Sequence, residues 1–339
     1  MCRFTVIRIM TNPQAEVRIN GRRYPVLERI EVGGRTFLVI ERLGNFLRPT
    51  YRVVQRGLTQ EVRCLQVLPY SNPVLSRLRL LSKVSRPNGN LPAIIDSHRR
   101  GDEIFLVTQW IDGPTMHDYL QDCRRGREPW PSAPVVINLL HGLAHGFRLL
   151  HDRLGVVHGD IHPNNLVLCR HTKRLIPIDF GSAWNVERGA GRQTGEGAAR
   201  SYAAPERFED GSQVSFQADQ FSAMAVCYVL LTGEVPYDGL GGRVAMASRR
   251  GGAHIPLAPP SKNLCHPAKL PARLCGDLDE VVGRGLAISA SDRFATTRAW
   301  IAALNGLRHN LAAEPAKTSS ANRWLLKRVS QMGKLLGLD

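Results

Sequence analysis

Four side chains in the middle of the chain have types and spacings that could do chemistry together. Asp160, His162 and Asn165 stand within one short stretch, and Asp179 follows further on, directly before Phe180-Gly181. A carboxylate such as Asp160 can accept a proton from a hydroxyl group. Carboxylate and amide oxygens, such as those of Asp179 and Asn165, are the ligands that Mg²⁺ prefers. The four groups could therefore bring a hydroxyl, a phosphate chain and a magnesium ion into one site.

Short apolar runs around these residues predict the strands that position them. One run ends at His158, a second covers Leu166 to Leu168, and a third ends at Asp179. Short apolar runs bounded by polar turns are typical of buried strands. We therefore expect short strands that deliver the polar side chains to a common rim.

The spacing of these residues fits a known pattern. His158, Asp160 and Asn165 match H-x-D-x-x-x-x-N, and Asp179 opens the triplet D-F-G. The stretch resembles the catalytic loop and metal-binding turn of the eukaryotic-like serine/threonine protein kinases of bacteria. The resemblance implies ATP and Mg²⁺ as cofactors, Asp160 as catalytic base, Asn165 and Asp179 as metal ligands, and His162 as a contact to the γ-phosphate. The alternative, polar turns without a chemical role, requires four polar residues to match by accident.

Three later features resemble the same family. Ala204-Pro205-Glu206 resembles the A-P-E sequence that closes an activation segment, and Asp219 begins an apolar stretch like the central helix of the large lobe. Arg293 resembles the late arginine that pairs with the glutamate of A-P-E, so we expect Glu206 and Arg293 to form an ion pair. Small-molecule phosphotransferases with an H-G-D loop generally lack these features, which therefore favour the protein-kinase branch.

The resemblance implies an α+β, bilobal protein-kinase-like fold over residues 36–308, with a β-rich N-terminal lobe (36–111) and a helical C-terminal lobe (112–308). Apolar alternation predicts strands at 37–43, 50–55, 62–68, 91–95 and 104–108, and apolar positions at helical spacing predict a helix at 74–84. Residues 1–35 read as an N-terminal β extension. Residues 309–339 read as a linker followed by a basic amphipathic helix at 323–338.

The expected N-terminal lobe departs from the family where phosphate should bind. Aligned on Leu43-Gly44, the family's phosphate-covering loop keeps only Gly44 of its three glycines, and a second register on Gly33-Gly34 keeps a central glycine but loses the flanking ones. Gln66 falls at the position of the strand lysine. No Asp or Glu occurs from residue 69 to residue 95, so the glutamate partner of that lysine is also missing. If the lobe has a phosphate-binding cation, the sequence leaves three candidates: Arg48, Arg52 and Arg63.

The stretch from Ile104 to Gly113 resembles the fifth strand and hinge of a kinase. Thr108 would lie at the back wall of a nucleotide pocket. Gln109, Trp110 and Ile111 would form the hinge, where the family binds adenine through backbone amides. The resemblance thus adds Thr108, Gln109, Trp110 and Ile111 to Gly44 and Gln66 as candidate nucleotide-binding residues.

The expected C-terminal lobe also has departures. Gly159 replaces the arginine that usually precedes the catalytic aspartate, so a phosphorylated activation segment has no partner there. His162 replaces a lysine, and Ala199 replaces the threonine that would bridge base and lysine. The substrate must therefore be positioned differently from that of an ordinary serine/threonine kinase.

The composition of the chain bears on the cellular compartment and on the class of binding partner. The 339 residues include seven scattered cysteines and no apolar run long enough to span a membrane, and the N-terminus lacks the features of a signal peptide. These features predict a cytoplasmic protein in a reducing compartment. The net charge of +16 favours an acidic protein partner, and the basic 323–338 segment could dock on a membrane surface or a partner. Basic residues are not interleaved with aromatic ones, which disfavours nucleic acid.

Three functions fit these residues. The leading interpretation is an ATP- and Mg²⁺-dependent kinase that phosphorylates Ser or Thr of a protein substrate. The rival is a pseudokinase, a scaffold or regulatory binding module with little or no catalysis, which the losses at Gln66 and in the glycine loop favour. The third is transfer to a small molecule, or of a different part of ATP, with the triphosphate in an altered pose.

Overall fold

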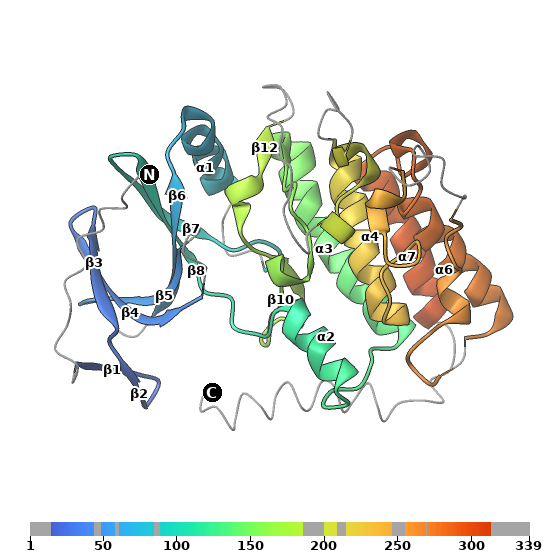
Figure 1. Cartoon of the computed structure of the whole chain (residues 1–339), viewed down its shortest axis with the longest axis horizontal. Coiled ribbons are helices and arrows are strands. Elements are labelled where there is room, and N and C mark those ends of the chain that lie inside the picture. The colour runs from blue at the N-terminus through green and yellow to red at the C-terminus, as the bar shows by residue number, and fades with distance from the viewer. Residues whose placement is uncertain are drawn as a thin grey trace. The chain divides into compact units, whose positions relative to one another are not determined.

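The computed structural model describes residues 15–43, 49–57, 61–84, 89–185, 200–208, 215–245, 255–268 and 270–312. They form two compact units (Figure 1). The N-terminal unit contains the described residues before Gly89 together with Pro92–Ile111. The C-terminal unit contains Gly89–Leu91 and the described residues from Asp112 onwards.

The N-terminal unit is built on one antiparallel sheet of six strands. The strand order in the sheet is β3 (Glu28–Val32), β4 (Arg35–Arg42), β5 (Thr50–Gln55), β6 (Val62–Pro69), β8 (Glu103–Gln109) and β7 (Ile94–Arg100). Helix α1 (Asn72–Val84) follows β6 and contacts β7. Four of the strands, β4, β5, β6 and β8, match predicted ones to within two residues, and α1 covers the predicted helix.

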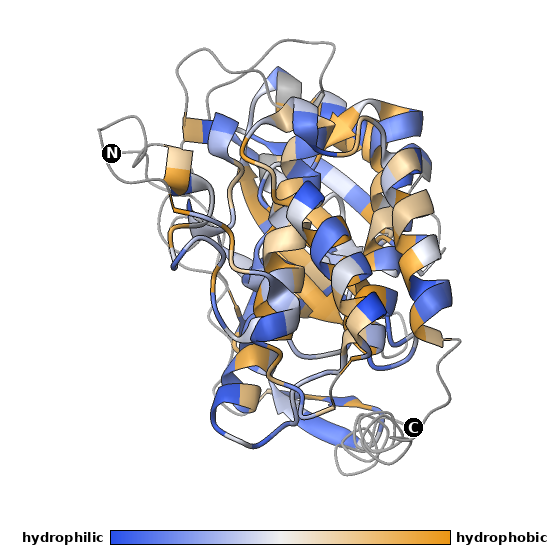
Figure 2. Cartoon of the chain, turned by 90° about the vertical axis from the view of Figure 1, so that its right-hand side faces the viewer, coloured by the Kyte–Doolittle hydropathy of each residue, from blue (hydrophilic) through white to orange (hydrophobic). Residues whose placement is uncertain are grey.

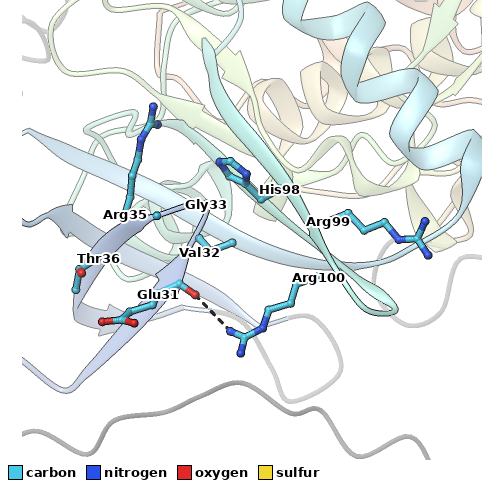
Figure 3. Close-up of a pocket in the computed structure, with 9 residues that line it drawn as sticks. Glu31, Val32, Gly33, Arg35, Thr36, His98, Arg99 and Arg100 are labelled. Carbon is cyan, nitrogen blue, oxygen red and sulfur yellow. Dashed lines mark hydrogen bonds between the residues drawn. The ribbon is translucent and has the colours of Figure 1, made fainter.

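The two faces of this sheet carry different residues because side chains alternate along a strand. One face, here called the inner face, is a cluster of buried apolar side chains: Ile30, Val32, Phe37, Val39, Tyr51, Val53, Leu65, Val67, Phe105 and Val107. The sheet curls around this cluster until the β3–β4 turn meets the far edge strand β7. Gly33 lies so close to His98 that an added Cβ would stand 2.2 Å from the ring (Figure 3). Arg35 pairs with Asp96 of β7 at 2.5 Å. The sheet is therefore a half-barrel.

The opposite face, here called the outer face, carries a small hairpin. Strands β1 (Glu16–Ile19) and β2 (Arg22–Pro25) are joined by Asn20-Gly21, both with positive φ as a two-residue hairpin turn requires. Ile19 packs against Ile40 and Val54, and Tyr24 lies against the same cluster. The expected N-terminal β extension thus packs on the sheet, and the boundary that we expected at residue 36 cuts through the β3–β4 hairpin.

The C-terminal unit is mainly helical (Figure 1). Its helices are α2 (Met116–Arg124), α3 (Ala133–Leu154), α4 (Phe216–Thr232), α6 (Ala272–Gly285) and α7 (Thr297–Ala312). All residues of α4 from Ala218 to Thr232 are buried, as expected of a helix that is apolar on every side. The other helices carry both hydrophobic and hydrophilic residues (Figure 2), and α3 packs against α4 and α7.

Short strands and turns connect these helices. Strand β9 (Val156–Val157) pairs with β12 (Trp184–Asn185), and β10 (Leu166–Leu168) pairs with β11 (Leu175–Pro177). Gly155 ends α3 in the left-handed conformation with φ of 61°, so the chain can turn directly from α3 into β9. The short strands expected from the apolar runs are therefore present.

Some boundaries differ from the predicted ones. Strand β7 begins at Ile94 and runs to Arg100, later than the predicted 91–95, because its polar residues pair with β8. Helix α7 continues to Ala312, four residues into the expected linker, because Leu311 is buried. Gly44, Arg48, Ala199 and the expected 323–338 helix lie outside the described residues. Among the helices that are described, none is long and apolar enough to cross a lipid bilayer.

A histidine pair on α3 makes the stability of the fold depend on pH. The Nε2 atoms of His141 and His145 are 3.2 Å apart, and burial, the charge of Arg308 and the neighbouring ring together lower the pKa of His141 to about 4. An unfolded histidine titrates near 6.5, so between these values acid protonates the unfolded chain but not the folded one. Stability that is present above pH 6.5 is therefore lost as the pH falls towards 4.

We expect His141→Gln to reduce this acid sensitivity. The melting temperature of the variant should fall less between pH 7.5 and pH 5 than that of the parent protein. His309→Gln, at an exposed position of α7, is the control and should leave the pH dependence unchanged. An equal fall in both variants would contradict the assignment to His141.

Candidate active site

The stretch that carries the candidate residues begins at a buried carboxylate. Asp219 on α4 is 1% exposed and accepts hydrogen bonds from the backbone N–H groups of His158 (2.8 Å) and Gly159 (2.9 Å). Its Oδ2 atom also lies 2.9 Å from Nε2 of His151. Burial alone would raise the pKa of Asp219, but the hydrogen bond and charge of His151 and the other donors outweigh it and lower the pKa. The start of the loop is thereby fixed to α4.

His158 links the loop to the strand that precedes Asp179. Its backbone N–H is bound by Asp219, and its Nε2–H donates to the Ile178 carbonyl at 3.0 Å. The ring also packs against Phe180, with centroids 4.9 Å apart. A buried histidine that bridges two loops in this way acts as a structural support for the residues on either side.

Asp160 and Asn165 are joined directly. A short 3₁₀ turn, Pro163–Asn165, brings the amide back so that its Nδ2 donates to the Asp160 carbonyl at 2.9 Å and to Oδ2 of Asp160 at 3.4 Å. These two acceptors fix the orientation of the amide, and its Oδ1 atom is left for a cation. Asp160 itself stays partly exposed.

Asp179 lies beside Asn165. The Ile178 N–H donates to the Asn165 carbonyl at 2.9 Å, which places the following residue at the same rim. Asp179 has a left-handed backbone with φ of 60°, and its Oδ1 accepts the Gly181 N–H at 3.1 Å. Backbone strain of this kind is common at functional sites, and here it turns the carboxylate towards the glycine turn.

The charges of both carboxylates, Asp160 and Asp179, act on His162. Its Nε2 is 3.7 Å from Oδ1 of Asp160. Burial lowers the pKa of His162, and the charge of His158 acts in the same direction, while Asp160 and Asp179 oppose the shift without reversing it. The imidazole is therefore neutral at pH 7 and can donate a hydrogen bond but adds no positive charge.

The oxygens at this rim suit Mg²⁺. The Oδ1 atom of Asn165 and the carboxylate of Asp179 are hard oxygen donors, as Mg²⁺ requires, and two protein ligands leave room for water and phosphate. No group of three or more His, Cys, Asp or Glu side chains occurs among the described residues in a metal-binding arrangement. The donor set thus fits a metal that shares its coordination with a substrate.

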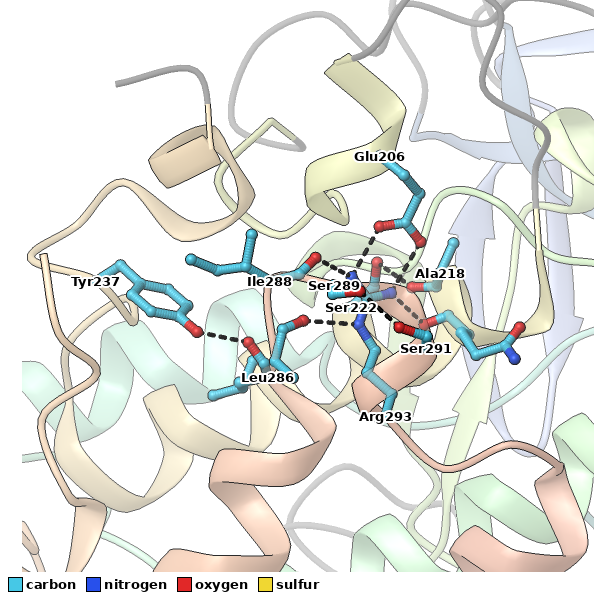
Figure 4. A network of polar contacts seen from close by, with 11 residues as sticks. Glu206, Ala218, Ser222, Tyr237, Leu286, Ile288, Ser289, Ser291 and Arg293 are labelled. Atoms are coloured by element: carbon cyan, nitrogen blue, oxygen red, sulfur yellow. Dashed lines mark hydrogen bonds and ion pairs between the residues drawn. The ribbon is translucent and has the colours of Figure 1, made fainter. Parts of the chain in front are cut away.

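The predicted ion pair between Glu206 and Arg293 is confirmed (Figure 4). Both nitrogens of the guanidinium fork bind the carboxylate, at 2.8 and 2.7 Å, and Arg293 is 1% exposed. The remaining donors of Arg293 are bound by the carbonyls of Ala287, Ile288 and Gln217. A buried arginine with all its donors used holds the segment around Glu206 firmly to the helical unit.

Sequence reasoning missed a second arginine in this region. Arg207 directly follows Glu206, and the charges of Asp219, Asp160 and Glu206 all raise its pKa, against a larger lowering by burial. The side chain therefore lies within electrostatic reach of the candidate base. The one sequence feature that points to Arg207 is its position directly after Ala204-Pro205-Glu206.

In the N-terminal unit, the candidate nucleotide-binding residues Gln66 and Thr108 lie on the outer face of the sheet, and Gln109, Trp110 and Ile111 lie at the end of β8. Gln66 lies opposite Thr50 and Leu106, and Thr108 lies opposite Cys64, so both belong to one face, two positions apart along β6. Both are buried. The backbone N–H of Gln109 already donates to the Ala93 carbonyl, whereas Trp110 and Ile111 are partly exposed.

A cavity of about 490 Å³ also lies on this unit, between the β3–β4 turn and β7 (Figure 3). Arg35, His98, Arg99 and Arg100 line it, but none of the candidate residues does. Arg35 and His98 share Asp96 as a partner, and Arg100 donates to the Glu31 carbonyl. The cavity follows from the curl of the half-barrel.

A half-barrel unit followed by a helical unit with a His-x-Asp loop, a D-F-G turn and a locked A-P-E glutamate defines a protein-kinase-like phosphotransferase fold. The model of the protein kinase domain matches residues 68–274, more than half of the chain. The chain belongs to the protein kinase family.

The relatives of the chain include bacterial kinases. The chain is 30% identical to the serine/threonine-protein kinase PknL of Mycobacterium tuberculosis, over 77% of this chain and 64% of PknL. It is 30% identical to the serine/threonine-protein kinase pkn2 of Myxococcus xanthus, over 53% of this chain and 21% of pkn2. The chain thus spans less than two thirds of these relatives.

Solved structures show the same fold. The kinase domain of Mycobacterium tuberculosis PknI superposes with a TM-score of 0.55, at 22% identity, over 82% of this chain and 98% of that domain. The kinase PK-1 of the Cydia pomonella granulovirus gives 0.58 at 19% identity, over 78% and 92% of the two chains. The predicted bilobal α+β kinase fold is confirmed.

We expect Asp219→Asn to loosen the catalytic loop. The new amide would point an N–H group at the donors of His158, Gly159 and His151, which now bind the carboxylate. Removing one partner of a buried charged pair lowers the unfolding free energy by about 3–5 kcal/mol. Denaturant unfolding measures this loss. Asp277→Asn, where the carboxylate accepts from exposed Asn310, is the matched control and should cost less than about 1 kcal/mol. Equal losses of unfolding free energy in the two variants would show that the hydrogen bonds of Asp219 stabilise the fold no more than a surface contact does.

Proposed function

We propose that the chain is an ATP- and Mg²⁺-dependent protein kinase that phosphorylates serine or threonine hydroxyls. The observation that carries this proposal is the bond from the Asn165 amide to Asp160. It leaves the Asn165 oxygen, together with Asp179, for a cation next to a partly exposed carboxylate. Relatives described as serine/threonine-protein kinases support the choice of substrate.

In this proposal each side chain has one task. Asp160 orients the substrate hydroxyl and accepts its proton as the oxygen attacks the γ-phosphorus atom of ATP, while the bond from that phosphorus to the β–γ bridging oxygen breaks and ADP leaves. Asn165 and Asp179 hold Mg²⁺, which when bound offsets the negative charge of the phosphates. His162, being neutral, donates a hydrogen bond to a phosphoryl oxygen. A protein with acidic residues near the acceptor hydroxyl suits the charge of +16.

The second candidate is a pseudokinase that binds partners with little or no catalysis. It is favoured by Gln66, a neutral residue at the strand-lysine position, and by α1, which contains no acidic residue. Transfer to a small molecule, or of another part of ATP, remains a third candidate for the same reason. The retained carboxylates at 160 and 179 favour catalysis, because a scaffold has no chemical need for them.

Variants of the two carboxylates test the proposal. Asp160→Ala should lower phosphate transfer by a factor of at least 100, since it removes the base, and should leave Mg²⁺–ATP binding unchanged. Asp179→Ala should abolish the dependence of ATP binding on Mg²⁺. Calorimetry and transfer of labelled phosphate to a protein substrate measure the two effects. Parent protein that binds Mg²⁺–ATP but transfers nothing would favour the pseudokinase.

Gln66→Lys separates an orthodox nucleotide pose from an altered one. A lysine on the outer face would add a charge for the phosphates and should tighten ATP binding about tenfold if they lie near β6. The ATP dissociation constant is the measurement. An unchanged constant would indicate that the phosphates lie elsewhere.

A further inference from the structure

The structure distinguishes among the three arginines that could replace the missing lysine. Arg48 lies outside the described residues. Arg63 lies opposite Val53, a member of the inner-face cluster, and its guanidinium binds Glu61 and the Val62 carbonyl. Because side chains alternate along β6, Arg63 belongs to the face opposite Gln66 and cannot act beside it.

Arg52 belongs to the correct face. It lies opposite Cys64 on β6, and Cys64 lies opposite Thr108 on β8, so these three form one row across the outer face. The next row contains Thr50, Gln66 and Leu106. Diagonal neighbours of this kind have Cα atoms about 7–8 Å apart, which is within the reach of an arginine side chain.

Aromatic rings hold the guanidinium of Arg52 in place. Its carbon lies 4.9 Å from the ring centroid of Trp110 and 5.6 Å from that of Tyr24. Trp110 follows β8, whereas Tyr24 comes from the β1–β2 hairpin that packs on this face. Aromatic rings at these distances attract a guanidinium by the cation–π interaction and accept none of its N–H groups in conventional hydrogen bonds.

Most of the N–H groups of the Arg52 guanidinium have no acceptor among the described residues of the unit. Nη1 pairs with Glu41 at 3.3 Å, and the Glu41 side chain is 48% exposed, so water screens the pair. The Nε–H of Arg52 and the indole N–H of Trp110 have no acceptor among the described residues. A cation with a weak partner, next to a second unused donor, suits an anionic ligand.

We propose that Arg52 binds the phosphate groups of the nucleotide, so that the cation lost at Gln66 is supplied from β5. The inference rests on the proposed function, because the anion is taken to be that of ATP. The β1–β2 hairpin then has a role in binding, since Tyr24 positions the arginine. Trp110 and Tyr24 hold the guanidinium on the side of the Arg52 row that faces away from Gln66. The phosphates therefore lie over the Arg52 row and next to Trp110, and the nucleotide pose differs from the one that the resemblance implies.

The test compares nucleotides that differ only in phosphate. Dissociation constants for ATP, ADP and adenosine are measured by calorimetry for the parent chain, Arg52→Gln and Arg63→Gln. Arg52→Gln should weaken ATP binding about tenfold or more and leave adenosine within twofold, because a charged hydrogen bond is lost. Arg63→Gln, on the opposite face of the same sheet, should change neither constant.

Glu41→Gln provides a second test that does not disturb the stack. Removing the exposed carboxylate frees Arg52, so ATP binding should tighten about twofold to fivefold while adenosine binding stays constant. Glu41 is exposed, so this variant should fold even if Arg52→Gln does not, which melting curves will show.

The contrary outcomes are distinct. If Arg52→Gln leaves ATP binding unchanged, or tightens ATP and adenosine binding alike, Arg52 is not a phosphate ligand and only blocks the outer face. Weaker ATP binding in Glu41→Gln would overturn the inference as well. A parent chain that binds no ATP at millimolar concentration overturns both this inference and the proposed function, whereas ATP binding that ignores Arg52 overturns only the inference.

Discussion

The buried carboxylate of Asp219 is the group on which the loop that carries Asp160 depends. It lies on the fully buried helix α4 and binds two backbone N–H groups at the start of the loop as well as the ring of His151 on α3. The other ring nitrogen of His151 bonds Thr297 at the start of α7. A charge in an apolar interior is costly unless its hydrogen bonds are satisfied. One satisfied carboxylate therefore joins three helices and the loop that carries Asp160.

Three of the departures from the family remove a positive charge, and they lie in both units. In the C-terminal unit, a glycine and a neutral histidine stand where the family has arginine and lysine, while Arg207 lies within electrostatic reach of Asp160. In the N-terminal unit, Gln66 is neutral and Arg52 supplies a charge on the same face. The carboxylates and the amide of the rim in the C-terminal unit are kept, whereas in each unit an arginine on another element carries positive charge nearby.

The local parts of the site could be predicted because the residues in contact are close to one another in the sequence. The bond from Asn165 to Asp160 spans five residues, and a single turn makes it. The ion pair of Glu206 with Arg293 spans 87 residues and was reached only through the resemblance. The stack on Arg52 joins β5, the end of β8 and a hairpin, so it depends on strand register and pleat. No run of residues encodes that contact, and the role of residues 15–25 was missed for the same reason.

The distribution of charge also bears on whether the chain is an enzyme or a scaffold. Asp160 and Asp179 both act electrostatically on one neutral imidazole, so the rim is negative and gains free energy when a cation binds. The fold does not need this arrangement, since the loop is held by Asp219 and His158 behind the rim. Metal-dependent phosphate transfer requires oxygen ligands that favour a bound cation. The rim has such ligands, and they are not the residues that hold the loop in place. In the proposed kinase, the residues that the chain lacks would affect how tightly the phosphates are held, and Arg52 on a neighbouring strand can meet that need.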